Sequence, residues 1–142
     1  MAQTPLQAAK VGQIVPLLGV ADMAASLRFY VDGLGAEITK RWEPEGVFRW
    51  AWLTIGEAAL MIQEPPPASQ VGPGSGWSLC LMCGDAIGLW REARARGLEP
   101  KRPFVGNGLW VTELVDPDGY RLEFESPTDV AEETEYDPAL HG

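Results

Sequence analysis

The chain has 142 residues, 46% of them hydrophobic, and a formal charge of −9. That length suits one domain without a stabilising disulfide or metal, because a chain of about 150 residues buries roughly 68–70% of its unfolded surface. The shortage of lysine and arginine argues against nucleic acid as a partner, and the single histidine, His141, argues against a zinc site built from several histidines.

The first half of the chain predicts a strand, a helix and three further strands. An apolar run over residues 14–20 indicates the first strand, and Asp22 is a good N-cap for a helix over residues 24–32. Turn-forming residues then separate three strand-like runs. These runs cover residues 37–42, 47–55 and 58–63. Residues 12–64 therefore form a first β-α-β-β-β module.

The second half repeats this order over residues 77–127. Asp85 again follows an apolar run, and Gly97 ends the helix 12 positions later, against 13 from Asp22 to Gly35. The strands that follow are expected at residues 99–104, 109–115 and 120–125. Residues 65–76, rich in proline and glycine, are expected to link the two modules.

Cys80 and Cys83 lie in an almost wholly apolar run, which predicts a buried strand. Residues three apart on a strand point to opposite faces, so these thiols should not meet. We expect two reduced cysteines in the core rather than a redox or metal pair.

Two strands predict the chemistry of a concave surface. Arg121, Glu123 and Glu125 alternate with apolar residues, so a charged face should line the concavity, with Ser78 on a neighbouring strand. Phe48, Trp50 and Trp52 share a strand face by the same period, and Trp110 lies on the counterpart strand. These aromatic rings are expected either to stack on a flat or cationic ligand or to close the cavity or a dimer interface.

The paired modules resemble the vicinal oxygen chelate superfamily, which includes glyoxalase I, extradiol dioxygenases and bleomycin resistance proteins. The resemblance rests on the helix sequence DMAASLRFY before Leu34-Gly35 and on the closing hairpin DPDGYRLEF, residues 116–124. It implies an α+β fold in which the modules form an open, barrel-like mixed sheet around a cavity. It also implies a homodimer whose cavity is formed by both chains.

Enzymes of that superfamily hold a divalent ion with four strand residues, and the matching positions here are Val15, Met61, Ser78 and Glu123. Only Glu123 is a good ligand for such an ion, so no metal and no cofactor is expected. A shift of one residue would bring Gln13, Gln63 or Glu64 nearer. Alternatively, Glu123 is an ion-paired surface residue with Arg121 or Arg49 as its partner.

The resemblance favours a metal-free binding protein that sequesters an aromatic or cationic small molecule without altering it. The residues expected to contact the ligand are Phe48, Trp50, Trp52, Met61, Ser78, Trp110, Arg121 and Glu123. The alternative is a lyase or dioxygenase that uses Glu123 as metal ligand or general base. A third hypothesis is an accessory domain that acts through its C-terminal tail.

Residues 128–142 carry five acidic residues and no lysine or arginine, which leaves a charge of −4 on the preceding residues. We expect this segment to be a mobile acidic tail. Residues 1–10 lack the pattern of a secretory signal, and no apolar stretch approaches the about 18 residues of a membrane span. We therefore expect a cytoplasmic protein without a membrane partner.

Overall fold

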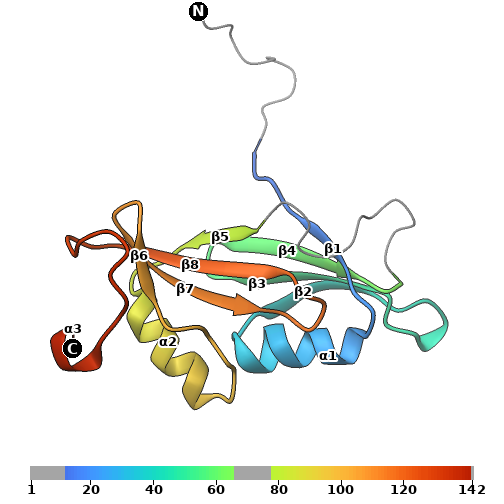
Figure 1. The fold of residues 1–142 in the computed structure, drawn as a ribbon. Helices are drawn as coiled ribbons and strands as arrows, with labels where there is room; N and C mark the ends of the chain where they lie inside the picture. The colour runs from blue at the N-terminus through green and yellow to red at the C-terminus, as the bar shows by residue number, and fades with distance from the viewer. Residues whose placement is uncertain (1–11, 66–77, 142) are drawn as a thin grey trace, which may run out of the picture.

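Two four-stranded sheets with helices on one side make up the computed structural model, which describes residues 12–65 and 78–141 (Figure 1). The first module contains β1 (Leu17–Gly19), α1 (Met23–Leu27), a π-helical continuation (Arg28–Gly33), β2 (Glu37–Trp42), a 3₁₀ turn (Pro44–Gly46), β3 (Trp50–Ile55) and β4 (Ala58–Gln63). The second contains β5 (Leu79–Met82), α2 (Ala86–Ala95), β6 (Phe104–Gly106), β7 (Leu109–Val115) and β8 (Arg121–Pro127), and α3 (Pro138–His141) follows it.

Both modules have the same topology. The strand orders are β1-β4-β3-β2 and β5-β8-β7-β6, and in each sheet the first strand runs parallel to the last. This confirms the predicted α+β fold with two β-α-β-β-β modules. The sheets are separate and are not closed into a barrel within the chain.

The helices begin where the sequence predicts. The side chain of Asp22 accepts the amide of Ala25 at 3.2 Å, and that of Asp85 accepts the amide of Gly88 at 2.9 Å. Each contact satisfies an amide that the first helical turn leaves without a partner. None of the helices in the described ranges is long and apolar enough to cross a membrane.

Three predicted strands are shorter than expected. Regular pairing begins only at Leu17 in β1, at Trp50 in β3 and at Phe104 in β6. Pro100 and Pro103 lack the amide hydrogen that a strand ladder needs, which accounts for the irregular segment before β6. Most of the predicted linker, residues 66–76, and also Trp77 lie outside the described residues.

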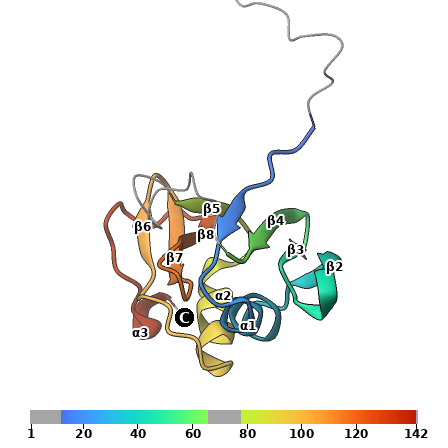
Figure 2. The same ribbon diagram turned by 90° about the vertical axis from the view of Figure 1, so that its right-hand side faces the viewer.

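One hydrophobic core joins the modules, with α1 and α2 lying along the same side of the sheets (Figures 1 and 2). Its buried residues come from both sheets and from the helices between them. They include Leu18, Tyr30, Ala51, Leu53, Leu60, Ile62, Ala93, Leu122 and Phe124. On β3 and β8 these residues alternate with more exposed ones, so each sheet buries one face and leaves the other available.

A buried polar contact also joins the modules. The Tyr30 hydroxyl donates to Asp116 at 2.7 Å, and the other carboxylate oxygen of Asp116 accepts the amides of Asp118 and Tyr120. Burial raises the pKa of Asp116, although these hydrogen bonds act in the opposite direction. A second cross-module bond runs from the Tyr120 hydroxyl to the carbonyl of Gly19 at 3.1 Å.

The expectation of a mobile tail is wrong for residues 128–141, which pack on the second module. Tyr136 is 1% exposed and lies in a cluster with Trp110, Val105 and Ile87. The Glu132 carboxylate accepts the amides of Asn107 and Gly108 at 3.0 and 2.9 Å. Part of the tail's acidity therefore holds the β6–β7 turn.

Replacing Tyr30 with phenylalanine leaves one oxygen of buried Asp116 without its donor. We expect the free energy of unfolding at pH 7 to fall by about 1–3 kcal/mol in urea titrations. Tyr120→Phe removes only the hydrogen bond to the neutral carbonyl of Gly19, so the free energy of unfolding should fall by about 0.5–1.5 kcal/mol. A loss for Tyr120→Phe equal to or greater than that for Tyr30→Phe would contradict this ranking.

The pH dependence has a defined sign. Since the folded-state pKa of Asp116 is raised, its contribution to stability is fully present below the unfolded pKa and is lost as pH rises through the folded pKa. The Tyr30 hydroxyl opposes this rise, because it donates a stronger hydrogen bond to the ionised carboxylate than to the neutral acid. The destabilisation caused by Tyr30→Phe in urea titrations should therefore shrink as acidification protonates Asp116.

Tyr136→Ala should lower the free energy of unfolding by about 3–5 kcal/mol, as other large aromatic truncations in cores do. Leu140→Ala is the matched control on the same segment, because Leu140 is 78% exposed and its truncation should change stability by less than about 0.5 kcal/mol. Similar small effects of both variants in urea unfolding would show that the tail does not contribute to the fold.

Candidate functional site

The exposed face of the first sheet is aromatic. Trp52 pairs with Met61 on β4, and Trp50 pairs with Trp42 on β2. These four residues, Trp42, Trp50, Trp52 and Met61, form what we call the aromatic face. Their β3 neighbours Ala51 and Leu53 are fully buried on the helix side, which leaves the tryptophans half-buried on the opposite side. The alternation along β3 thus puts Trp50 and Trp52 on one face, and the pairing of β3 with β4 adds Met61.

Phe48 does not share this face with Trp50 and Trp52, contrary to expectation, and Trp110 lies on the helix side of the second sheet. Phe48 precedes the regular part of β3, packs against the core and lies under Arg41, whose guanidinium carbon is 4.9 Å from the ring centroid. Trp110 is 8% exposed and packs edge-on against Tyr136, with centroids 5.9 Å apart. Both rings therefore have packing roles on the helix sides of their sheets.

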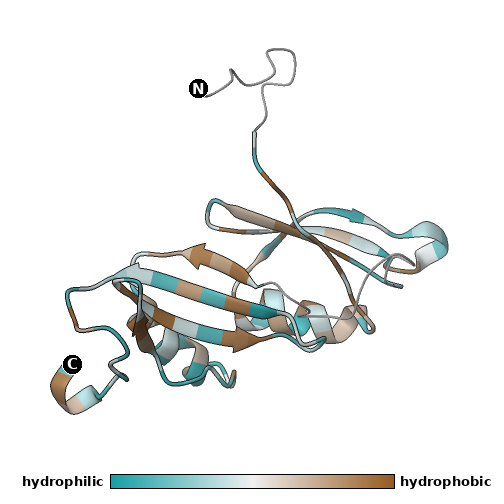
Figure 3. Ribbon diagram, turned by 45° about the horizontal axis from the view of Figure 1, so that its top comes forward, coloured by the Kyte–Doolittle hydropathy of each residue, from teal (hydrophilic) through white to brown (hydrophobic). Residues whose placement is uncertain are grey.

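The exposed face of the second sheet is acidic. Glu123 lies between Glu113 on β7 and Cys80 on β5, and Glu125 is two residues further along β8. We call Glu113, Glu123 and Glu125 the acidic face. Arg121, also on β8, is exposed, and the alternation of the strand residues is visible in Figure 3.

Hydrogen bonds fix the position of Glu123. Ser78 Oγ and Cys80 Sγ each donate to Glu123 Oε2 at 3.4 Å, so Ser78 and Glu123 meet as predicted by the pattern. Arg49 Nη1 lies 3.7 Å from Glu64 Oε1 of its own module. Lys101 lies 3.4 Å from Glu113 Oε2, while Glu113 Oε1 is buried and has no hydrogen-bond partner within the described ranges.

Cys80 is exposed, which corrects the expectation of a core cysteine, and Cys83 is half-buried. Both thiols are free, as predicted. The apolar run that contains them is buried only on one side, because Met82 is also 64% exposed. Partial desolvation raises the pKa of Cys80, and the hydrogen bond to Glu123 and the charge of Glu125 add to the rise.

The four positions that hold a metal in the related enzymes do not fit one here. Val15 and Met61 offer no oxygen or nitrogen side-chain ligand, and Ser78 is a neutral hydroxyl. Cys80, Glu123 and Glu125 have ligand atoms within 4.8 Å of one another, but all three come from the edge and centre of one sheet. The four expected positions therefore do not supply the ligand set of a divalent ion.

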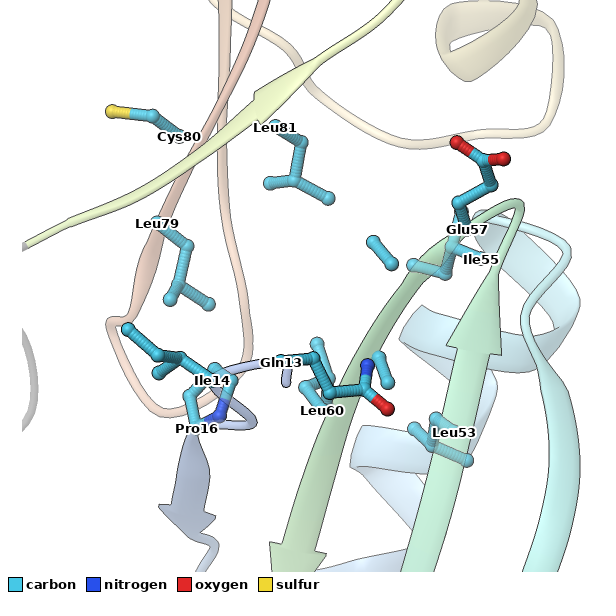
Figure 4. A pocket seen from close by; sticks show the side chains of 12 residues that line it. Gln13, Ile14, Pro16, Leu53, Ile55, Glu57, Leu60, Leu79, Cys80 and Leu81 are labelled. Atoms are coloured by element: carbon cyan, nitrogen blue, oxygen red, sulfur yellow. The ribbon is translucent and has the colours of Figure 1, made fainter. Parts of the chain in front are cut away.

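A cavity of about 350 Å³ separates the two sheets (Figure 4). β1 pairs only with Met61–Gln63, so the first half of β4 faces β5 across a gap. Leu79 and Leu81 point into it from β5, while Cys80 points away. The remaining lining is mainly apolar and includes Ile14, Pro16, Ile55 and Leu60. The sequence pattern singles out neither this cavity nor Glu113, because both depend on how strands pair.

Glu123→Gln should lower the pKa of Cys80, since it removes a charge that disfavours the thiolate. In a Cys83→Ser background we expect faster reaction with a disulfide reagent at pH 8, because more of the thiol is ionised. Glu92→Gln, at an exposed position on α2, should leave the rate unchanged. Equal rate profiles against pH for both variants would contradict the coupling of Cys80 to Glu123.

A family model described as the Glyoxalase/Bleomycin resistance protein/Dioxygenase superfamily matches residues 10–124. None of the curated proteins matches the chain.

Several solved structures share the fold. A bleomycin resistance determinant encoded on transposon Tn5 is 26% identical, with a TM-score of 0.66 over 82% of this chain and 98% of that one. A bleomycin-binding protein complexed with bleomycin is 25% identical, with a TM-score of 0.64 over 83% and 100%. TnmS3, an antibiotic-binding protein from Streptomyces sp. CB03234, is 20% identical, with a TM-score of 0.69 over 84% and 98%.

The family model covers most of the chain, including both modules and the closing hairpin. The strand orders and the parallel pairing of first and last strands agree with this match. The chain belongs to the glyoxalase/bleomycin resistance protein/dioxygenase superfamily.

Proposed function

We propose that the protein binds an aromatic small molecule with a positively charged group and releases it unaltered. The proposal rests on the different chemistry of the two exposed sheet faces. One is lined by tryptophans and the other by carboxylates. Two similar structures, at 25% and 26% identity, are described as bleomycin-binding or bleomycin resistance proteins. They support small-molecule binding as the common activity.

The aromatic face supplies a surface on which a planar ring can stack. Trp50 and Trp52 are neighbours on one face of β3, and Met61 lies beside Trp52. Large aromatic side chains contribute contact area with little loss of side-chain freedom, which favours their use in binding sites. A half-buried ring is already fixed by its neighbours, so a ligand need not order it.

The acidic face supplies the attraction for a positively charged group. Ser78 and Cys80 hold Glu123, and the carboxylate oxygens of Glu125 lie close to those of Glu123. A ligand ammonium or guanidinium would provide hydrogen bonds that these oxygens accept, and such charge-assisted bonds are stronger than neutral ones.

A homodimer would combine the two faces. Neither Trp52 nor Glu123 is among the residues that line the cavity between the two sheets. We propose that a second copy brings its acidic face opposite the aromatic face of the first. The free edges of β1 and β5 leave room for such an approach.

Bleomycin is a suitable probe because one similar protein is solved in complex with it. We expect saturable binding by calorimetry with the compound recovered intact. Trp52→Leu should weaken binding by about 2- to 30-fold, corresponding to the loss of about 0.5–2 kcal/mol of ring contact. Trp90→Phe is the control, since Trp90 packs against Tyr136 on the helix side.

Two results would contradict this function. The first is the absence of binding by bleomycin and by a panel of smaller aromatic compounds whose positive group is set apart from the ring. The second is turnover of the bound compound that is lost in Glu123→Gln, which would instead establish a general base. Light scattering with and without ligand tests the dimer independently of affinity.

A further inference from the structure

Lys40 lies over the aromatic face. Its ammonium nitrogen is 4.9 Å from the centre of the Trp52 ring, and the two residues are paired across β2 and β3. Among the residues that the structure describes, no carboxylate lies within ion-pair distance of this nitrogen. The Trp52 ring is therefore the main recorded partner of the Lys40 charge.

A β-bulge puts Lys40 in this position. The pairing of β2 with β3 shifts between Ile38 and Lys40, so that Thr39 and Lys40 together oppose Trp52. The Thr39 hydroxyl donates to the Trp52 carbonyl at 3.2 Å. Without the bulge, strand alternation would turn Lys40 to the same side as Ile38, which packs against the core.

Arg41, the next residue along β2, covers an aromatic ring on the opposite face of the sheet. It is paired with buried Ala51, lies over Phe48 and forms an ion pair with Glu43 at 3.0 Å. Lys40 and Arg41 thus each cover one aromatic ring, but only Lys40 covers a ring of the aromatic face. This makes Arg41 a matched internal control.

We propose that Lys40 is a specificity-determining residue that selects the charge of the ring stacked on Trp52. The proposal rests on ligand binding at the aromatic face and refines the class of ligand. A planar cation must displace the ammonium and then meets its charge nearby. A ring that carries a carboxylate or another anionic group keeps Lys40 as a partner. The positive group of the natural ligand therefore lies away from the ring, toward the acidic face.

The expected effect of Lys40 on ligand affinity can be taken from the known strength of exposed cation–ring contacts and ion pairs. An exposed cation over an aromatic ring changes an equilibrium by about two- to fivefold, and an exposed ion pair has a similar effect. Removing the Lys40 ammonium should weaken the binding of an anionic ring and strengthen the binding of a cationic ring. The ratio of their dissociation constants should then change by about tenfold.

Three naphthalene probes of nearly equal size test this inference: 2-naphthoate, 2-naphthylmethanol and 2-naphthylmethylammonium. Their binding is measured by calorimetry to the full chain, to Lys40→Met and to Arg41→Met. Methionine keeps the apolar stem of lysine and removes the charge. The unfolding midpoint of each variant shows whether it remains folded.

The ratio of the dissociation constants of the naphthoate and the ammonium probe in the wild-type protein is the reference. In Lys40→Met the ratio should shift by about tenfold toward the cation, with the alcohol changed less than either. Arg41→Met should keep the wild-type ratio. An equal ratio in Lys40→Met and wild type would overturn the role of Lys40 while leaving ligand binding intact.

The bleomycin titration distinguishes failure of the underlying function. If bleomycin and all three probes fail to bind every folded variant, then both the proposed function and the role of Lys40 are contradicted. If the probes bind but Arg41→Met shifts the ratio as much as Lys40→Met, charge selection does not depend on the ring that is covered, and the assignment to Lys40 is wrong.

Discussion

One constraint governs this molecule: each sheet can bury only one of its faces, because the two helices that cover the sheets lie on the same side (Figure 1). Ala51, Leu53 and Leu122 are fully buried on that side. The alternation of side chains along a strand then delivers the intervening residues to the opposite side. The composition of the exposed faces is thus set by the same period that builds the core.

The modules share a topology but differ in what they expose. The counterpart of the aromatic face in the first sheet is a row of carboxylates in the second. This difference costs the core little, since residues on the exposed faces are not part of the packed cluster. The contacts between modules, including that of Tyr30 with Asp116, lie on the helix side. Ligand chemistry and module assembly are therefore carried by different residues.

The features that depend on local sequence pattern could be predicted from the sequence. Asp22 and Asp85 cap their helices, and Trp50 and Trp52 lie on one face as the period of two predicts. The internal repeat also predicts the fold, because the two halves contain the same elements in the same order.

Features that depend on distant pairing escaped prediction. Phe48 lies outside the regular strand, and Trp110 is held by Tyr136, a residue of the segment expected to be mobile. Cys80 is exposed because β5 lies at the edge of its sheet and is covered by the core on one side only. The bulge at Thr39 has no glycine to mark it, so the sequence suggests an uninterrupted strand.

That bulge decides which side chains β2 presents on the exposed face of its sheet. In the bulged register the surface presents an ammonium and the Trp42 indole, whereas regular pairing beyond Ile38 would present the Thr39 hydroxyl and the Arg41 guanidinium. A point-like charge on a flexible stem would give way to a planar group that binds carboxylates in a bidentate manner. The recognition chemistry of the first sheet is therefore encoded in backbone registration as well as in residue identity, and a variant that leaves every ligand-contacting residue unchanged can still alter which molecule is bound.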